Sequence, residues 1–76
     1  MITKTQYIRP NITIETEIVG DEQYYVYNYQ GIQYKVFDTL TDALTCANGE
    51  YIKPCREFDN EYKLNQYFQK VSLKTT

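Results

Sequence analysis

Apolar and aromatic residues concentrate near the middle of the chain, where residues 24–37 read YYVYNYQGIQYKVF. Five of the nine tyrosines fall in this stretch, together with two valines, an isoleucine and a phenylalanine. Aromatic and β-branched residues favour a pleated, half-buried surface, and Asn28 and Gly31 suit the two ends of a turn. The stretch therefore predicts a β-hairpin around which the remaining elements are arranged.

The turn of this hairpin determines which tyrosines share a face. A type I turn followed by a glycine with positive φ places Val26 opposite Tyr34. Two sets of side chains then face opposite ways: Tyr24, Val26, Ile32, Tyr34 and Val36 on one side, and Tyr25, Tyr27, Gln33 and Lys35 on the other. A two-residue turn at Gln30-Gly31 would exchange the tyrosines between the faces, because strand side chains alternate. We favour the first register because it places Gln33 and Lys35 on the more polar face and Val26 on the apolar one.

Residues 11–19 alternate between apolar and polar positions. Ile12, Ile14 and Ile18 point one way, and Thr13, Glu15 and Glu17 point the other. A period of two predicts a strand with one buried face and one solvent-exposed face. Together with the hairpin it makes a three-stranded antiparallel meander. Residues 1–10 predict an extended arm, in which Pro10 belongs at an edge or a strand entrance because it lacks an N–H.

The period changes from two to about 3.6 after Phe37. An apolar stripe follows at helical spacing: Leu40, Ala43, Leu44 and Ala47. This predicts a helix over residues 39–48, with Thr39 as its cap and Asn48-Gly49 as its end.

A second helix is predicted after a connector. Residues 50–58 form that connector, with a short strand at Tyr51-Ile52. Asp59 is expected to cap the helix, which runs to about Val71, and residues 72–76 are expected to fray.

These elements predict one α+β domain over residues 1–76, with both helices packed on one face of the three-stranded sheet. The opposite face is expected to remain open to solvent. It would carry Glu15, Glu17, Tyr25, Tyr27, Gln33 and Lys35.

Composition and charge narrow the functional classes. The net charge is −2, which disfavours non-specific binding to nucleic acid or anionic membranes, although residues 51–76 carry five basic and three acidic side chains. No long apolar run predicts a membrane span or a secretory leader, so we expect a cytoplasmic protein with Cys46 and Cys55 reduced. A bridge between the two cysteines stays open.

The chain offers little for catalysis or cofactor binding. It contains no histidine, so histidine catalysis is excluded, and two cysteines do not make a four-ligand zinc site. Its three glycines are isolated, so no phosphate-binding loop is present. We therefore expect no enzyme activity, no metal and no cofactor.

The sharper functional hypothesis is a small regulatory or protein-interaction module that binds through its tyrosine-rich face. The candidate contact residues are Tyr25, Tyr27, Tyr29, Gln33, Lys35, Glu15 and Glu17. Tyrosines beside glutamates suit a basic protein surface through cation–π and ion-pair contacts, or a second copy of the chain in a homodimer.

Two alternatives remain beside this hypothesis. Base stacking of single-stranded nucleic acid on the same tyrosines is less favoured, because Glu15 and Glu17 flank them. The other reading is that Tyr25, Tyr27 and Tyr29 only strengthen strand pairing, or are covered by the N-terminal arm.

Overall fold

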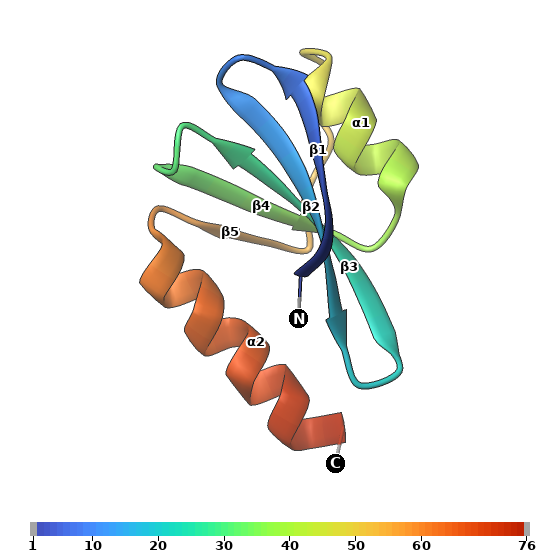
Figure 1. Cartoon of the computed structure of the whole chain (residues 1–76), viewed down its shortest axis with the longest axis vertical. Coiled ribbons are helices and arrows are strands. Elements are labelled where there is room, and N and C mark those ends of the chain that lie inside the picture. The colour runs from blue at the N-terminus through green and yellow to red at the C-terminus, as the bar shows by residue number, and fades with distance from the viewer. Residues whose placement is uncertain (1, 76) are drawn as a thin grey trace.

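The fold is a five-stranded antiparallel sheet with two helices, shown in Figure 1 by a computed structural model that describes residues 2–75 and the side chains of residues 2–73. The strands lie in the sheet in chain order. The elements are β1 (Ile2–Arg9), β2 (Ile12–Val19), β3 (Glu22–Tyr29), β4 (Gln33–Phe37), α1 (Leu40–Ala47), β5 (Arg56–Phe58) and α2 (Glu61–Thr75). The α+β class and the antiparallel meander are confirmed, but the sheet has five strands where the sequence predicted three.

The two additional strands lie at the edges of the sheet. The predicted extended arm is β1, which pairs with β2 over its whole length. β5 pairs with β4, where Phe58 lies opposite Tyr34. The predicted strand at Tyr51-Ile52 is wrong, because pairing begins only after Pro54, a residue that cannot donate to a ladder.

The β3–β4 hairpin has the predicted grouping of side chains but a register two residues away. Val26 lies opposite Val36 rather than opposite Tyr34. The turn is centred one position later than expected, since Gln30 and Gly31 both adopt a left-handed backbone with φ of 55° and 74°. A shift of two residues preserves the alternation, so each side chain keeps its predicted face.

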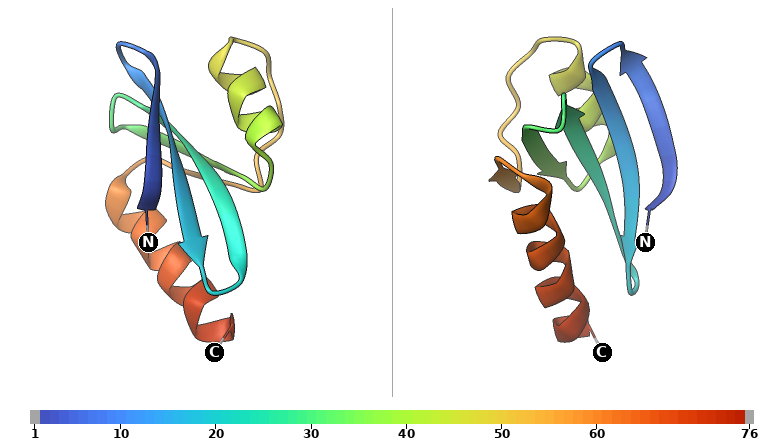
Figure 2. Two further views of the ribbon diagram at one scale, coloured as in Figure 1. Left: turned by 45° about the vertical axis from the view of Figure 1, so that its right-hand side comes forward. Right: turned by 60° about the vertical axis from the view of Figure 1, so that its left-hand side comes forward.

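The two helices cover opposite faces of the sheet, so the prediction that both pack on one face is wrong (Figure 2). α1 packs against β2, β3 and β4 over a cluster that includes Ile14, Tyr27 and Phe37. α2 packs against β2 and β5 over a second cluster that includes Val26 and Val36. Consecutive strand residues point to opposite sides, which places the two clusters on different faces. Because the hairpin is apolar on both faces, each face needs a cover.

The ends of α1 are those that the sequence predicted. Thr39 caps the helix, with its Oγ1 accepting a hydrogen bond from the Asp42 backbone N–H at 3.3 Å. Gly49 has a φ of 100°, and the following Glu50 N–H donates to the Thr45 carbonyl at 3.3 Å. This arrangement satisfies carbonyl groups that the last turn leaves open.

α2 begins after a different cap from the predicted one. Asn60, not Asp59, accepts the hydrogen bond from the Lys63 backbone N–H, at 2.9 Å, while the Asp59 carboxylate lies 3.2 Å from the Lys63 Nζ. The helix continues to Thr75, so the segment predicted to fray is helical up to that residue, and residue 76 lies outside the described part of the chain. No helix within residues 2–75 is long and apolar enough to cross a membrane.

Two isoleucines predicted for the core lie at the surface. Ile18 is 38% exposed and Ile32 is 61% exposed. α1 has eight residues and is therefore about 12 Å long, too short to cover a whole face of the sheet. Ile18 lies at the far end of β2, and Ile32 lies in the hairpin loop.

Candidate functional site

The seven residues predicted to contact a partner lie on two faces of the sheet. Five of them are on the face that α1 covers: Tyr25, Tyr27, Tyr29, Gln33 and Lys35. Glu15 and Glu17 are on the α2 face, because they lie opposite Val26 and Tyr24 in the β2–β3 pair. The expectation that Glu15 and Glu17 share one open face with Tyr25, Tyr27, Gln33 and Lys35 is therefore wrong.

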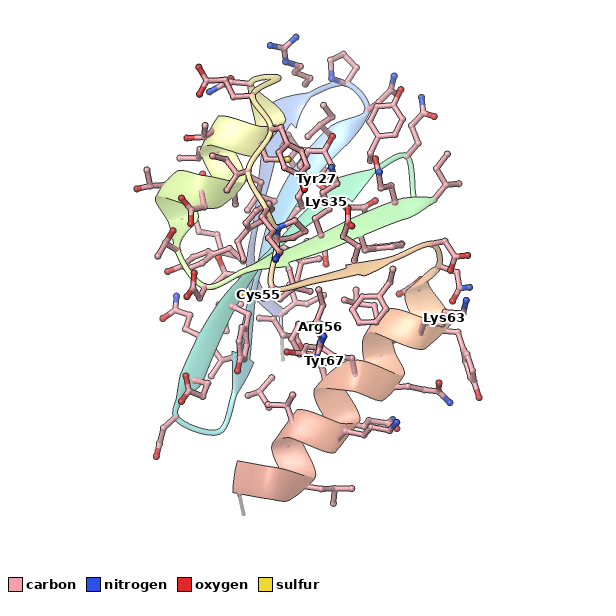
Figure 3. The ribbon with its side chains drawn as sticks, turned by 180° about the vertical axis from the view of Figure 1, so that it is seen from behind. Tyr27, Lys35, Cys55, Arg56, Lys63 and Tyr67 are labelled. Carbon is pink, nitrogen blue, oxygen red and sulfur yellow. The ribbon has the colours of Figure 1, made fainter. Side chains whose placement is uncertain are left out.

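Tyr27 belongs to the core rather than to an exposed surface. It is 7% exposed, and burial raises the pKa of its hydroxyl above the ordinary value, with smaller contributions from Cys46 and Tyr29. The Lys35 Nζ lies 5.6 Å from the centroid of the Tyr27 ring, and Figure 3 shows the two side chains together. Tyr25 is partly buried against the same cluster. For Tyr27 the structural reading, strand pairing and packing, is the one that the burial supports.

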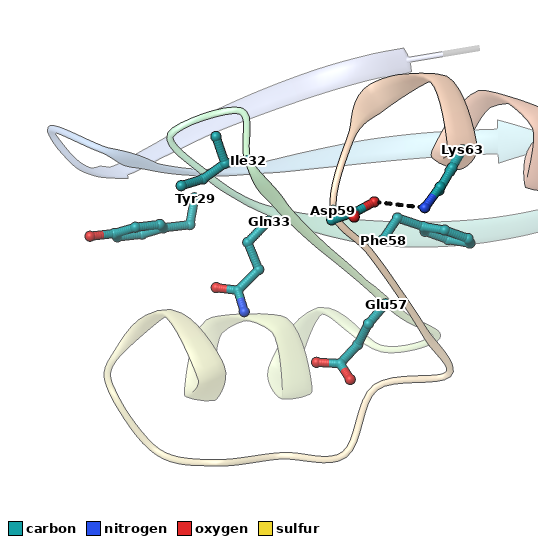
Figure 4. A pocket seen from close by; sticks show the side chains of 7 residues that line it. All are labelled: Tyr29, Ile32, Gln33, Glu57, Phe58, Asp59 and Lys63. Atoms are coloured by element: carbon teal, nitrogen blue, oxygen red, sulfur yellow. Dashed lines mark ion pairs between the residues drawn. The ribbon is translucent and has the colours of Figure 1, made fainter.

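A cavity of about 650 Å³ lies at the tip of the β3–β4 hairpin (Figure 4). Its lining residues are Tyr29, Ile32, Gln33, Glu57, Phe58, Asp59 and Lys63. Glu57 lies 4.0 Å from the Lys35 ammonium, and Asp59 lies 3.2 Å from that of Lys63. Each carboxylate therefore lies within ion-pair distance of a lysine, so charges of both signs lie at this cavity.

A smaller and more enclosed cavity, of about 250 Å³, lies between α2 and the sheet. Its lining residues are Ile2, Glu15, Glu17, Val26, Asn28, Tyr34, Glu61, Leu64, Asn65 and Phe68. Three of these are carboxylates, and none of the described lining residues is a lysine or an arginine. We call this space the acidic cavity.

Two elements position the carboxylates of the acidic cavity. Glu15 and Glu17 come from β2, and Asn28 on β3 donates from its Nδ2 to Glu15 Oε1 at 3.5 Å. Glu61 lies in the first turn of α2, where the helix dipole favours a negative charge. The carboxylates are therefore held from opposite walls of the cavity.

Tyr34 is the most deeply buried polar side chain of this cavity. It is 6% exposed, and its hydroxyl has no hydrogen bond to another described residue. Among the described residues no fully sealed polar side-chain atom lacks a partner, so this hydroxyl keeps some contact with solvent, and the Tyr34 side chain lines the cavity. Burial, and then the charges of Glu61 and Glu15, raise the pKa of the Tyr34 hydroxyl. The hydroxyl therefore remains protonated at neutral pH and can donate or accept a hydrogen bond.

The acidic cavity suits an organic cation. Within residues 2–75 no group of three or more histidine, cysteine, aspartate or glutamate side chains is placed to hold a metal ion. At about 250 Å³ the cavity is smaller than the roughly 300–1,000 Å³ of pockets for drug-sized ligands, so it fits a single side chain. A guanidinium group carries five N–H donors and can pair with carboxylates, with the Asn65 amide oxygen and with an aromatic ring such as Phe68.

Sequence reasoning placed two residues of this cavity, Glu15 and Glu17, in a binding site and missed the others. Tyr34 was placed on the apolar face of the hairpin, and Glu61 was given no role. Two patterns in the sequence could have indicated that these residues lie together. The continuous apolar run of residues 24–27 is typical of a strand buried on both faces, and residues 61, 64, 65 and 68 have the spacing of one helix face.

No family model, no curated protein and no solved structure matches this chain.

Proposed function

We propose that this protein is a small non-catalytic interaction module, and that it binds a protein partner by accepting one basic side chain in the acidic cavity. One observation carries the proposal: the carboxylates of Glu15 and Glu61 and the buried Tyr34 side chain line a cavity of about 250 Å³ whose described lining contains no lysine or arginine. Glu15 offers carboxylate oxygens from β2 and Glu61 offers them from the first turn of α2. A cationic N–H donor that enters the cavity can form charge-assisted hydrogen bonds with them.

The proposed partner has the chemistry that the sequence predicted, but it binds at the acidic cavity rather than on the tyrosine-rich face of the sheet. A basic partner, ion pairs and an aromatic neighbour were expected, and Glu15 and Glu17 remain part of the site. Tyr34 and Phe68 take the place of Tyr27 as the aromatic component. The nucleic-acid alternative has weaker support, since base stacking needs an accessible ring face and Tyr27 is 7% exposed.

Arginine is the preferred occupant over lysine. Its planar guanidinium can donate to two carboxylates at once, whereas an ammonium group is a compact and strongly hydrated point charge. Glu15 and Glu61 stand on different walls of the cavity, so a fork of donors can bridge them. The Tyr34 hydroxyl then accepts one of the remaining N–H groups.

The test is a titration of the ¹⁵N-labelled protein with acetyl-argininamide, followed by amide chemical shifts in NMR. A matched titration uses acetyl-citrullinamide, which has nearly the same shape and no charge. We expect saturable shifts at Glu61, Asn65 and Phe68 with the arginine compound only. A dissociation constant near 1 mM corresponds to about −4 kcal/mol, which is reasonable for two or three charge-assisted hydrogen bonds in a partly hydrated site.

Two variants locate the binding. Glu61→Gln removes one carboxylate of the acidic cavity and should weaken binding of the arginine compound several-fold. Glu50→Gln makes the same change in net charge at an exposed position of the connector and should leave binding unchanged. The proposal fails if the citrulline compound gives the same shifts, or if the two variants weaken binding equally.

A further inference from the structure

A second groove, of opposite charge, lies between β5 and the other flank of α2. It has a volume of about 380 Å³ and is lined by Arg56, Phe58, Lys63, Gln66, Tyr67 and Lys70. Three of these residues are basic, and none of the described lining residues is acidic. We call it the basic groove.

Local geometry explains how the basic groove is assembled. Lys63, Tyr67 and Lys70 are spaced i, i+4 and i+7 on α2 and so share one helix face. Arg56 and Phe58 are two residues apart on β5 and point to the same side of the sheet. Figure 3 shows Arg56 beside Tyr67, with Lys63 at the start of the helix. The groove therefore runs along α2 with β5 as its other wall.

The charges of the basic groove are available to a ligand. No ion pair joins Arg56 or Lys70 to another described residue. Lys63 lies 3.2 Å from Asp59, but the two side chains are 57% and 73% exposed, and such surface pairs contribute little. An incoming carboxylate can therefore compete for all three basic side chains.

The aromatic floor of the groove favours a peptide over a nucleic acid. The rings of Phe58 and Tyr67 pack on each other with centroids 5.5 Å apart, and Tyr67 packs on Phe68 at 5.4 Å. The rings are tilted by 42° and 57° to one another, so each pair partly covers its own faces and leaves less flat surface for stacking on bases, whereas ring edges can receive an aliphatic side chain.

We propose that the basic groove binds an acidic peptide segment in an extended conformation, with carboxylates at its basic side chains and an apolar residue on Phe58 and Tyr67. Lys63 and Lys70 are about 10 Å apart along the helix axis, a span of about three residues of extended chain. A segment of four to six residues, with acidic side chains flanking one apolar side chain, matches this length. The inference is independent of the acidic cavity, which uses the opposite flank of α2.

The experiment measures fluorescence anisotropy of a labelled peptide, Gly-Glu-Glu-Leu-Glu-Glu-Gly, with the full-length protein at low salt. Its groove variant is Arg56→Gln/Lys63→Gln/Lys70→Gln. The control variant, Lys4→Gln/Arg9→Gln/Lys53→Gln, makes the same charge change at three exposed positions outside the groove. We expect roughly tenfold weaker binding in the groove variant and less than twofold in the control, since each exposed pair contributes a fraction of a factor of ten.

A charge-retaining variant shows whether weaker binding results from the lost charges or from misfolding. Arg56→Lys/Lys63→Arg/Lys70→Arg should keep most of the affinity, and a thermal melt confirms that each variant folds. The inference is overturned if both glutamine variants weaken binding equally, or if a ten-nucleotide oligothymidine binds more tightly than the peptide. Glu61→Gln should leave peptide binding intact. The two proposals can therefore fail separately: the acidic cavity is tested by binding of acetyl-argininamide, and the basic groove by binding of the peptide.

Discussion

Replacing Tyr34 with phenylalanine separates the contribution of its hydroxyl to binding from its contribution to stability. The side chain is 6% exposed, and its hydroxyl makes no hydrogen bond to another described residue. Phenylalanine keeps the ring that packs beside Val36 and Leu64 and removes only the oxygen. A buried tyrosine with a structural hydrogen bond would lose about 0.5–1.5 kcal/mol of stability from this change. We expect no such loss here.

The expected magnitudes follow from the position of the hydroxyl. In the free protein the free energy of unfolding should stay within about 0.5 kcal/mol of the parent or rise slightly, because an unpaired polar atom is removed from a confined site. In the complex the hydroxyl would accept a hydrogen bond from a charged donor, which is worth about 1.5 kcal/mol at the low end of its range. This corresponds to roughly tenfold weaker binding of acetyl-argininamide.

Urea unfolding followed by circular dichroism gives the stability, and the NMR titration gives the affinity. Tyr27→Phe is the matched control, because Tyr27 is also buried but lies on the α1 face. Its affinity for the arginine compound should equal that of the parent. The reasoning is refuted if Tyr34→Phe loses more than about 1 kcal/mol of stability, or if it binds the arginine compound as well as the parent does.

Three further predictions concern the core and its titrating groups. Phe37 is 1% exposed, so Phe37→Ala should lower the free energy of unfolding by about 3–5 kcal/mol in urea titrations; a loss under 1 kcal/mol would contradict its core position. Burial raises the pKa of the Cys46 thiol, while Cys55 is exposed, so a thiol reagent should label Cys55 quickly and Cys46 only as the protein unfolds. Burial also raises the pKa of Tyr27 and Tyr34 above their unfolded value of about 10. Their contribution to the free energy of unfolding is therefore full below pH 10 and is lost as the pH rises above it. Urea titrations at rising pH should show that the free energy of unfolding falls less steeply in Tyr34→Phe than in the parent protein.

Local features of the fold could be predicted from the sequence. Thr39, the apolar stripe after it and Gly49 defined α1 because capping and periodicity depend on neighbouring residues. The hairpin kept its predicted faces even though the register differed by two residues, since only an odd shift exchanges them. The turn itself was misplaced because Gln30 adopts a positive φ that its residue type does not suggest.

The side of the sheet that each helix covers could not be predicted from these local patterns. An amphipathic helix needs an apolar surface, and this hairpin offers one on each face. The glutamates of β2 were correctly assigned to the more polar side of their strand. That side is nevertheless covered by α2. The helix brings Glu61, from a distant part of the sequence, to the same cavity as Glu15. The acidic cavity thus depends on which face of the sheet α2 covers. The alternating residue pattern of one strand does not determine that long-range contact.

The central claim, that the space beneath α2 receives a guanidinium group, is tested most directly by intermolecular nuclear Overhauser contacts. The measurement records contacts from the δ-methylene protons of bound acetyl-argininamide to aromatic protons of the protein. We predict contacts to the rings of Phe68 and Tyr34, which line the cavity, and none to Tyr27 beneath α1. Contacts confined to surface tyrosines such as Tyr51 or Tyr62, with none to Phe68 or Tyr34 at saturation, would contradict the claim.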